Sequence, residues 1–318
     1  MAITLAQARK LTTDKLASQI IDEFRKDPLL EMMVFDDCVA LNGGSSLNYV
    51  YNRVKTLPTA DFRAINNEYT PQESDTDQIT VTLKPFGGAF EIDRIIQNDV
   101  KGITNQLAFQ LAQKISATKA LFSDTFINGD SAVTATAFDG INKAVTGSST
   151  ELVPASDIDL SDSTAITANA NTFMDMLDSM LSNMSSTPSA LLMNKKVYAI
   201  MSGIARRSGY FSTSDVDAFG KPVTKYQGVQ LLPLGDKPGT ANPIIGIDAT
   251  AKTTSIFGVT IDLAGTHAVS PQGTNVINQY LPDFKTPGAV KKGEVEIVCA
   301  VAVKATRSIS ALRKIKVG

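Results

Sequence analysis

The chain has 318 residues, 43% of them hydrophobic, and its 30 lysines and arginines nearly balance 32 acids, giving a formal net charge of −2. This length supports one large domain or two medium ones, and the near-neutral charge argues against a protein that coats nucleic acid, which needs a clustered cationic excess. The longest apolar run, Ile297 to Val303, is far too short to cross a bilayer. The N-terminal residues also lack the apolar core of a secretory signal. We therefore expect a soluble protein made in a reducing compartment.

The N-terminal residues are predicted to form two short helices. Apolar residues recur at helical spacing from Leu5 to Arg25, Pro28 ends that pattern, and Leu29 to Val39 forms the second helix. We expect residues 1–45 to form an N-terminal arm that lies on a neighbouring copy. An ordinary core helix would show the same pattern, so that alternative stays open.

From Ser46 the apolar spacing changes to two, which is typical of β-strands. Two alternating runs, 47–54 and 79–84, are joined by about twenty mostly polar residues, and a connection of that length is usually functional or disordered. Two strands alone are only marginally stable in water. Residues 46–95, with a tip at about 56–78, are therefore predicted to form a projecting hairpin that docks on another subunit.

Opposite charges gather in this connection and near the C-terminus. Five acids against one base lie between Asp61 and Asp77, whereas seven bases against two acids lie between Lys291 and Lys316. We hypothesise that the acidic loop of one copy lies over the basic strands of the next; the alternative is two solvated faces without contact. The residues of this hypothetical contact are Asp61, Glu68, Glu73, Asp75 and Asp77 with Lys304, Arg307, Arg313, Lys314 and Lys316.

Asn98 to Gly129 is predicted to be one long amphipathic helix, because apolar residues recur on one face and polar residues occupy the other. Asn98 or Asp99 is expected to cap its start, and Asn128–Gly129 to end it in a left-handed conformation. The alternative is two shorter helices broken near Gly102, since an interior glycine costs about 1 kcal/mol relative to alanine.

The following part of the chain reads as a helix, a buried strand and a second helix. Thr164 to Met184 has helical spacing, Ala190 to Met193 is a short wholly apolar run, and Lys195 to Ile204 is helical again. Nearer the C-terminus, Val295 to Thr306 alternates as a long strand, and Ile309 to Val317 pairs with it or follows it. These elements indicate an α+β protein.

The sequence lacks the residue patterns of common catalytic and metal sites. His267 is the single histidine and has no Cys, Asp or Glu within three residues, and Cys38 and Cys299 lie far apart. The nucleophile-elbow, phosphate-binding and zinc-binding motifs are absent. We predict no enzymatic activity, no metal and no cofactor.

Four stretches, in this order, resemble the major capsid proteins of tailed bacteriophages. They are the strand–loop–strand of Ser46 to Lys84, FEIDRIIQND running into the helix from Val100 to Asn128, the helix–strand–helix of Phe173 to Ile204 with ALLMNKKVYAIMSGI, and RSGYF followed by FGKPVTKYQGVQLLPLGD. The resemblance implies the tailed-phage capsid fold, with a long spine helix. Its parts would be an N-terminal arm (1–45), an extended-loop hairpin (46–95), a peripheral domain with the spine helix (96–155), an axial domain (156–283) and C-terminal peripheral-domain strands (284–318).

The function implied by this resemblance is self-assembly into hexamers and pentamers of an icosahedral shell that encloses packaged double-stranded DNA. The implied partners are further copies of the chain, with scaffolding, portal and decoration proteins, DNA only in non-specific proximity, and no membrane. The shell would be a virion capsid assembled in the cytoplasm of a host bacterium. Alternatives are an encapsulin-type nanocompartment around a cargo enzyme, a soluble α/β enzyme with the long loop as a lid, and a carbohydrate-binding or tail-associated module.

Overall fold

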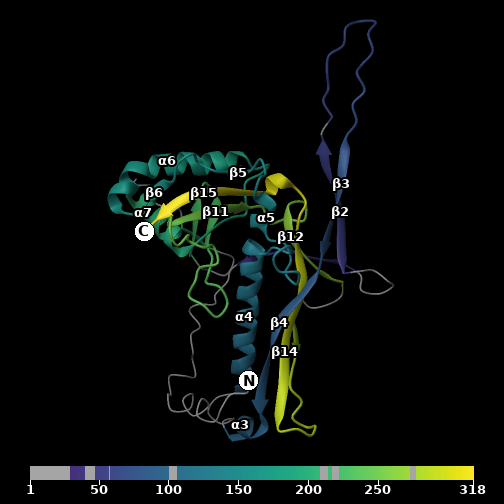
Figure 1. The fold of residues 1–318 in the computed structure, drawn as a ribbon, viewed down its shortest axis with the longest axis vertical. Helices are drawn as coiled ribbons and strands as arrows, with labels where there is room; N and C mark the ends of the chain where they lie inside the picture. Colours follow the sequence, from purple (N-terminus) through teal and green to yellow (C-terminus); the bar gives the residue numbers. More distant parts are fainter. Residues whose placement is uncertain are drawn as a thin grey trace.

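The computed structural model describes residues 29–39, 47–56, 58–99, 106–207, 214–216, 222–272 and 277–318. Figure 1 shows an elongated molecule built along one long helix, α4 (Gln106–Asn128), which runs beside a ribbon of two strands. A layer of sheet and helices lies beside one end of α4 (Figure 1). On the other side of the two-stranded ribbon, a separate hairpin projects away from the molecule (Figure 1). The predicted mixture of helix and sheet is confirmed. The predicted helix from Leu5 to Arg25 lies outside the described residues.

The ribbon belongs to a five-stranded sheet whose centre is the fourteen-residue strand β14 (Val290–Val303). β4 (Lys84–Asp93) pairs antiparallel with the first ten residues of β14, from Val290 opposite Asp93 to Cys299 opposite Lys84. β13 (Asn278–Tyr280) and β12 (Thr266–Pro271) also pair with β14, and β1 (Phe35–Val39) lies parallel to β12. The ribbon needs glycine at Gly87, where a Cβ atom would meet the Val295 carbonyl oxygen.

The N-terminal part of the described chain is integrated into the core. Only α2 (Leu29–Met32) is helical, and the residues that follow form β1, so the predicted helix over Leu29–Val39 is wrong in its second half. Leu29, Met33 and Val39 are buried in the main hydrophobic core. Residues 29–39 are therefore packed on their own chain, and the N-terminal arm over residues 1–45 stays a prediction.

The second sheet has eight strands, and β7 (Ala190–Met193) lies inside it between β11 (Thr253–Val259) and β10 (Val229–Pro233). All four β7 residues are fully buried, which confirms the buried strand predicted from their unbroken apolar run. The other members are β5 (Glu151–Leu152), β6 (Ile158–Leu160), β8 (Ser214–Val216), β9 (Pro222–Tyr226) and β15 (Ile309–Val317).

Each face of this sheet is covered by a different hydrophobic core. Leu191 and Met193 lie in a core with residues of α6 (Ser163–Ser182) and α7 (Lys195–Arg207). Ala190 and Leu192 lie on the opposite face of β7 and belong to the main core. That core also contains Phe122 and Phe126 of α4 and residues of the five-stranded sheet. The two sheets and the end of α4 are therefore packed together through one continuous core.

The long helix ends at Asn128, where the sequence predicts, and its described part begins at Gln106. Asn98 lies in a separate short helix, α3 (Arg94–Asp99), and residues 100–105 lie outside the described residues. The left-handed conformation expected at Gly129 is wrong, because its φ angle is not positive. Glycine is instead required by close packing: a Cβ atom there would lie 2.2 Å from the Phe138 carbonyl oxygen.

The C-terminal strand β15 does not lie beside β14. It follows β14 after a single 3₁₀ turn, η2 (Thr306–Ser308), and enters the eight-stranded sheet between β11 and β5. Ile309–Val317 therefore follows the long strand rather than pairing with it, and β12 pairs with β14. The sequence leaves this open because alternation shows which face of a strand is buried but not which strand lies beside it.

Candidate assembly surface

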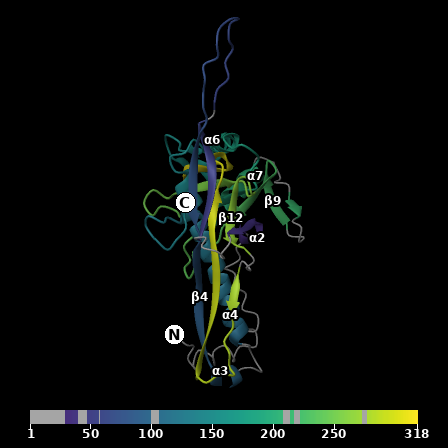
Figure 2. The ribbon, with the colours of Figure 1, turned by 90° about the vertical axis from the view of Figure 1, so that its right-hand side faces the viewer.

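The most exposed feature of the molecule is a two-stranded hairpin made of β2 (Asn48–Thr56) and β3 (Asp75–Thr82). The strands pair antiparallel from Asn48 opposite Thr82 to Thr56 opposite Asp75, and the connecting loop extends far beyond the rest of the chain (Figures 1 and 2). The described loop residues, 58–74, are all exposed. A loop this long without a core of its own presents a large surface to other molecules.

The base of the hairpin is held firmly against the body. The Tyr51 hydroxyl donates a hydrogen bond to the Val303 carbonyl at 2.7 Å, and the ring of Tyr49 meets the ring of His267 edge-on with centroids 5.9 Å apart. The ammonium of Lys304 lies 5.6 Å from the Tyr49 ring centroid. The hairpin is therefore anchored at one end, and its loop reaches away from that anchor.

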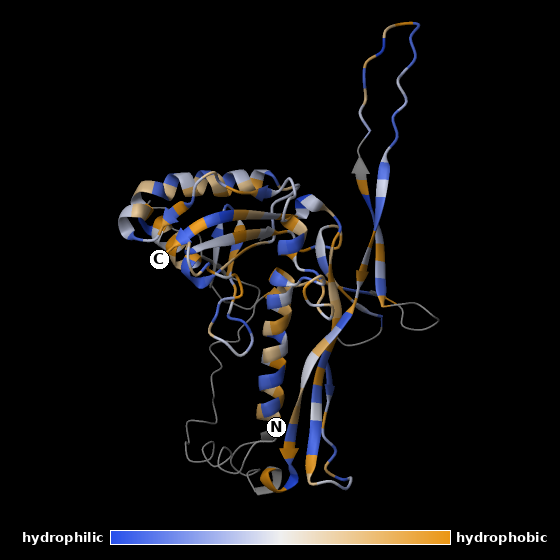
Figure 3. Ribbon diagram, viewed as in Figure 1, coloured by the Kyte–Doolittle hydropathy of each residue, from blue (hydrophilic) through white to orange (hydrophobic). Residues whose placement is uncertain are grey.

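The loop is partly ordered by its own contacts. Gln72 Oε1 accepts hydrogen bonds from the backbone and hydroxyl of Thr59, and Arg63 lies 5.3 Å from the Tyr69 ring centroid. Three large apolar side chains remain on its surface, with Phe62 107%, Ile65 89% and Tyr69 62% exposed. Figure 3 shows hydrophobic residues at the outer end of the loop. Charge counting along the sequence finds the acids of this loop but not these apolar residues, which are spread among mostly polar neighbours.

The five acids of the hypothetical contact divide between two places. Asp61, Glu68 and Glu73 are exposed on the projecting loop, where no other element of the described chain covers them. Asp75 and Asp77 lie in β3, and Asp77 is the cross-strand partner of Arg53 in β2. The loop thus carries three acids beside its apolar residues, while the other two belong to the strand pair.

Three of the five bases in the hypothetical contact are held by their own chain. Arg313 donates from Nε to Glu151 Oε1 at 2.9 Å, and Lys314 donates to the Pro154 carbonyl at 3.2 Å. Lys316 lies 2.7 Å from Asp159, and hydrogen bonds from Lys316 and Ser161 together lower the pKa of Asp159 to about 2. All three bases lie in β15, away from the hairpin (Figure 1).

The two remaining bases lie closer to the hairpin. Lys304 contacts Tyr49 at the hairpin base, and Arg307 is exposed in the short turn η2 that follows β14. The pairing of acids and bases between copies concerns a second chain and stays a prediction. Within one chain, Arg313 and Lys316 form ion pairs and Lys314 donates a hydrogen bond, whereas Lys304 lies over an aromatic ring and Arg307 is exposed.

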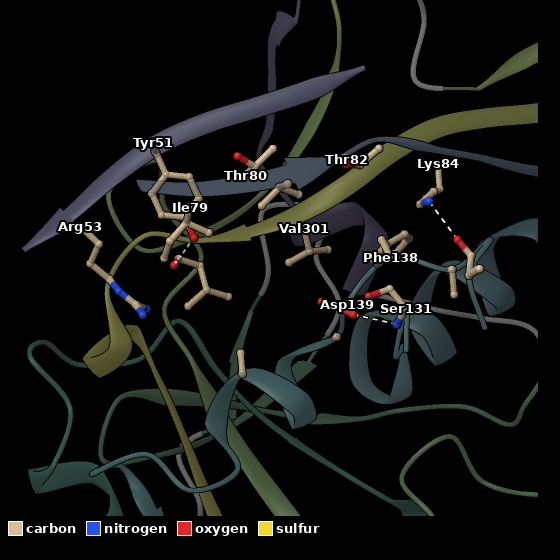
Figure 4. A pocket seen from close by; sticks show the side chains of 16 residues that line it. Tyr51, Arg53, Ile79, Thr80, Thr82, Lys84, Ser131, Phe138, Asp139 and Val301 are labelled. Atoms are coloured by element: carbon tan, nitrogen blue, oxygen red, sulfur yellow. Dashed lines mark hydrogen bonds between the residues drawn. The ribbon is translucent and has the colours of Figure 1, made fainter. Parts of the chain in front are cut away.

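A groove of about 530 Å³ lies below the hairpin (Figure 4). One wall comes from the hairpin, with Tyr51, Arg53 and Ile79, and the other from the segment around Phe138 and Asp139. Hydrogen bonds from Lys84 to the Ala135 carbonyl and from the Ser131 backbone to Asp139 hold the second wall in place. The groove therefore offers aromatic, aliphatic and basic groups on a preformed surface.

A second group of exposed apolar residues lies at the opposite end of the molecule. Ile95 of α3 is 71% exposed, and Val290, at the start of β14, is 47% exposed; Arg94 donates a backbone hydrogen bond to Ala289 beside them. Tyr280, the last residue of β13, and Leu281, which follows it, are also more than half exposed. The molecule thus carries uncovered apolar side chains at both ends of its long axis (Figures 1 and 3).

The reactive side chains do not form a site within the described residues. His267 and Cys299 are both fully buried, and burial raises the pKa of the Cys299 thiol far above its usual range. No group of three or more His, Cys, Asp or Glu side chains positioned to hold a metal ion occurs in the described ranges. Among the described helices, none has the length and apolar character that crossing a lipid bilayer would require.

Comparison with known proteins gives a clear result only at the level of structure. No family model and no curated protein sequence matches the chain. Among solved structures, the SrpI encapsulin of Synechococcus elongatus PCC 7942 is 15% identical, with a TM-score of 0.66 over 99% of this chain and 97% of that chain. The capsid of a native GTA particle is 13% identical, with a TM-score of 0.58 over 93% and 92%.

The capsid of Myoviridae phage XM1 is also 13% identical, with a TM-score of 0.57 over 99% of each chain. These likenesses extend over nearly the whole length of both partners in each comparison. The chain therefore has the tailed-phage capsid fold, which the sequence resemblance had indicated, and this fold is shared by viral capsids and an encapsulin.

Proposed function

We propose that this chain is a major capsid protein that self-assembles into the hexamers and pentamers of an icosahedral shell around packaged double-stranded DNA. The observation that carries the proposal is the projecting loop, whose Phe62, Ile65 and Tyr69 are exposed in a single chain that has the fold of assembled shell proteins. A shell gives these side chains a neighbouring copy to contact.

The energetics of the loop favour a contact between copies. Burial of one large apolar side chain stabilises an interface by about 1.5–3 kcal/mol, so the three apolar residues of the loop together provide a substantial driving force. The loop of one copy and the receiving surface of the next are different patches, and such a head-to-tail contact generates rings when the rotation from one copy to the next closes. Rings of five and six are the units from which an icosahedral shell is built.

Further parts of the proposal follow from the shell function. Its partners are other copies of the chain, together with scaffolding, portal and decoration proteins, and DNA lies near the inner surface without sequence-specific contact. The net charge of −2 supports this, because a strongly basic surface would hold DNA tightly. The protein would act without catalysis, metal or cofactor, and the capsid would assemble in the cytoplasm of a host bacterium.

An encapsulin-type nanocompartment is the second candidate. It is favoured by one observation, the TM-score of 0.66 with the SrpI encapsulin, compared with 0.58 and 0.57 for the two capsids. The fold of one chain is compatible with both functions, so the contents of the shell must distinguish them.

The test is to isolate particles from cells that carry the gene in its natural genomic setting and to analyse what they protect. A capsid would contain double-stranded DNA that resists added nuclease until the shell is opened. A nanocompartment would instead contain a second protein in fixed proportion to the shell. Particles that hold a cargo enzyme and no DNA would contradict the capsid proposal.

A further inference from the structure

The single histidine of the chain lies in an unusual position. His267 of β12 is completely buried, and within the described structure its ring nitrogens make no hydrogen bond of good geometry, only a marginal interaction with the Asp262 backbone. A buried polar group without a partner costs free energy, so the fold tolerates an unfavourable group at this point. The position also lies directly at the base of the projecting hairpin, through the contact with Tyr49.

Charged and titratable groups from several elements surround this imidazole. Tyr49 of β2 meets it edge-on, with an interplanar angle of 90°, and Asp36 of β1 places Oδ2 3.9 Å from Nε2. Lys304 follows β14, and its ammonium lies over the Tyr49 ring that contacts His267. Asp262 lies in the turn before β12. The imidazole is therefore located where the hairpin, the edge strand and the end of the ribbon meet.

These surroundings favour the neutral form. Burial lowers the pKa of His267 below its ordinary value of 6.5, and Lys304 lowers it further, while Asp36 and Asp262 act in the opposite direction. When the hairpin base opens, the imidazole becomes hydrated and regains its ordinary proton affinity. The open arrangement thus binds a proton more tightly than the closed one, and acid favours opening below about pH 6.5.

We propose that His267 is a pH-sensitive latch for the hairpin: when it takes up a proton, the contact between the hairpin base and the body weakens and the hairpin is released. The latch acts within one chain and does not depend on the proposed function. Its consequence for assembly does rest on that function, because release of the hairpin would move the loop that contacts the next copy.

Hydrogen–deuterium exchange of the unassembled chain tests the latch. Opening constants for peptides covering β2 and β3, corrected for intrinsic exchange, should rise by up to about tenfold for each pH unit below about 6.5. A peptide covering β15 is the internal reference and should not show this rise. In His267→Gln, which cannot become charged, the acid response of the hairpin should disappear.

Two further variants keep the histidine and change only its charged neighbours. Asp36→Asn removes a carboxylate that favours the charged imidazole, so the acid-induced increase in hairpin opening should become larger. Lys304→Met removes a cation that disfavours the charged imidazole, so the acid-induced increase in hairpin opening should become smaller. These opposite effects would not arise from a purely structural role of the cluster.

Three results would overturn the proposal. They are a wild-type hairpin whose opening does not change with pH, an acid response that persists in His267→Gln, and an equal response in β15, which would indicate global unfolding. Each result can be obtained whether or not the protein forms shells, so failure of the latch can be distinguished from failure of the capsid proposal.

Discussion

At the scale of single residues, buried polar groups with complete hydrogen bonding fix how elements meet. Asn194, between β7 and α7, accepts a hydrogen bond from the Val197 backbone at 2.9 Å and so caps the start of α7. Its amide nitrogen donates to Thr254 Oγ1 at 2.8 Å. One side chain therefore connects the helix, the central strand and β11.

Replacement of Asn194 should show both roles. Asn194→Ala is expected to lower the free energy of unfolding by about 1–3 kcal/mol, since it removes a helix cap and leaves a buried partner unsatisfied. Asn194→Asp retains the acceptor for the Val197 backbone and should preserve the start of α7 better. Urea denaturation followed by circular dichroism measures both. A loss below about 0.5 kcal/mol in the alanine variant would show that the connection is unimportant.

The Asp159–Lys316 contact predicts a specific pH dependence. Because hydrogen bonds from Lys316 and Ser161 lower the pKa of Asp159 to about 2, the folded chain holds this carboxylate ionised more strongly than the unfolded chain does. The contact therefore stabilises the fold above the ordinary pKa of 3.8, and the effect is lost as the pH falls toward 2. Carboxyl NMR should show a titration midpoint below 3.8, and Lys316→Met should raise it. A midpoint that does not respond to the substitution would refute the assignment.

At the scale of secondary-structure elements, the sequence predicts what each segment is more reliably than what it contacts. The apolar run Ala190–Met193 and its two flanking helices are found as predicted, because local spacing determines them. The partner of Ile309–Val317 depends on residues far away in sequence, and so does the role of Gly129, which is fixed by Phe138. Leu29–Val39 is misread because a short apolar run fits a helix or a strand.

Two glycines offer a matched test of this distinction. Gly129→Ala should lower the free energy of unfolding by about 1–3 kcal/mol, because the new Cβ atom would overlap the Phe138 carbonyl. Gly203→Ala, inside α7, has no atom within 4 Å of its new Cβ and should raise stability by about 0.5–1 kcal/mol. Thermal and urea denaturation would compare the two variants. Equal effects would mean that close packing at Gly129 does not determine its identity.

In the hairpin too, local spacing predicts the element itself but not the contacts that its residues make. The strand–loop–strand pattern predicts the projecting hairpin correctly, because its spacing changes visibly to two. Charge counting alone does not predict which bases are available, since Arg313 and Lys316 find their partners, Glu151 and Asp159, only in the folded chain. The exposure of Phe62 likewise depends on how far the loop extends from the body.

At the scale of the whole molecule, the loop is expected to be required for association but not for folding. Phe62→Ser combined with Ile65→Ser should leave the thermal stability of the chain unchanged while reducing assembly strongly, because both side chains are almost fully exposed in the single chain. Val133→Ser is the matched control, since Val133 is 83% exposed elsewhere. Light scattering measures the mass of each variant. Full-size assemblies from the double variant would exclude the loop as the contact.

Negative-stain electron microscopy of the purified protein is the most direct test of the proposed self-assembly into closed shells. We expect closed particles, or rings of five and six copies, with a matching mass by light scattering. A chain that remains a monomer at every salt and protein concentration, and in the presence of co-expressed proteins from its genomic neighbourhood, would contradict the proposal.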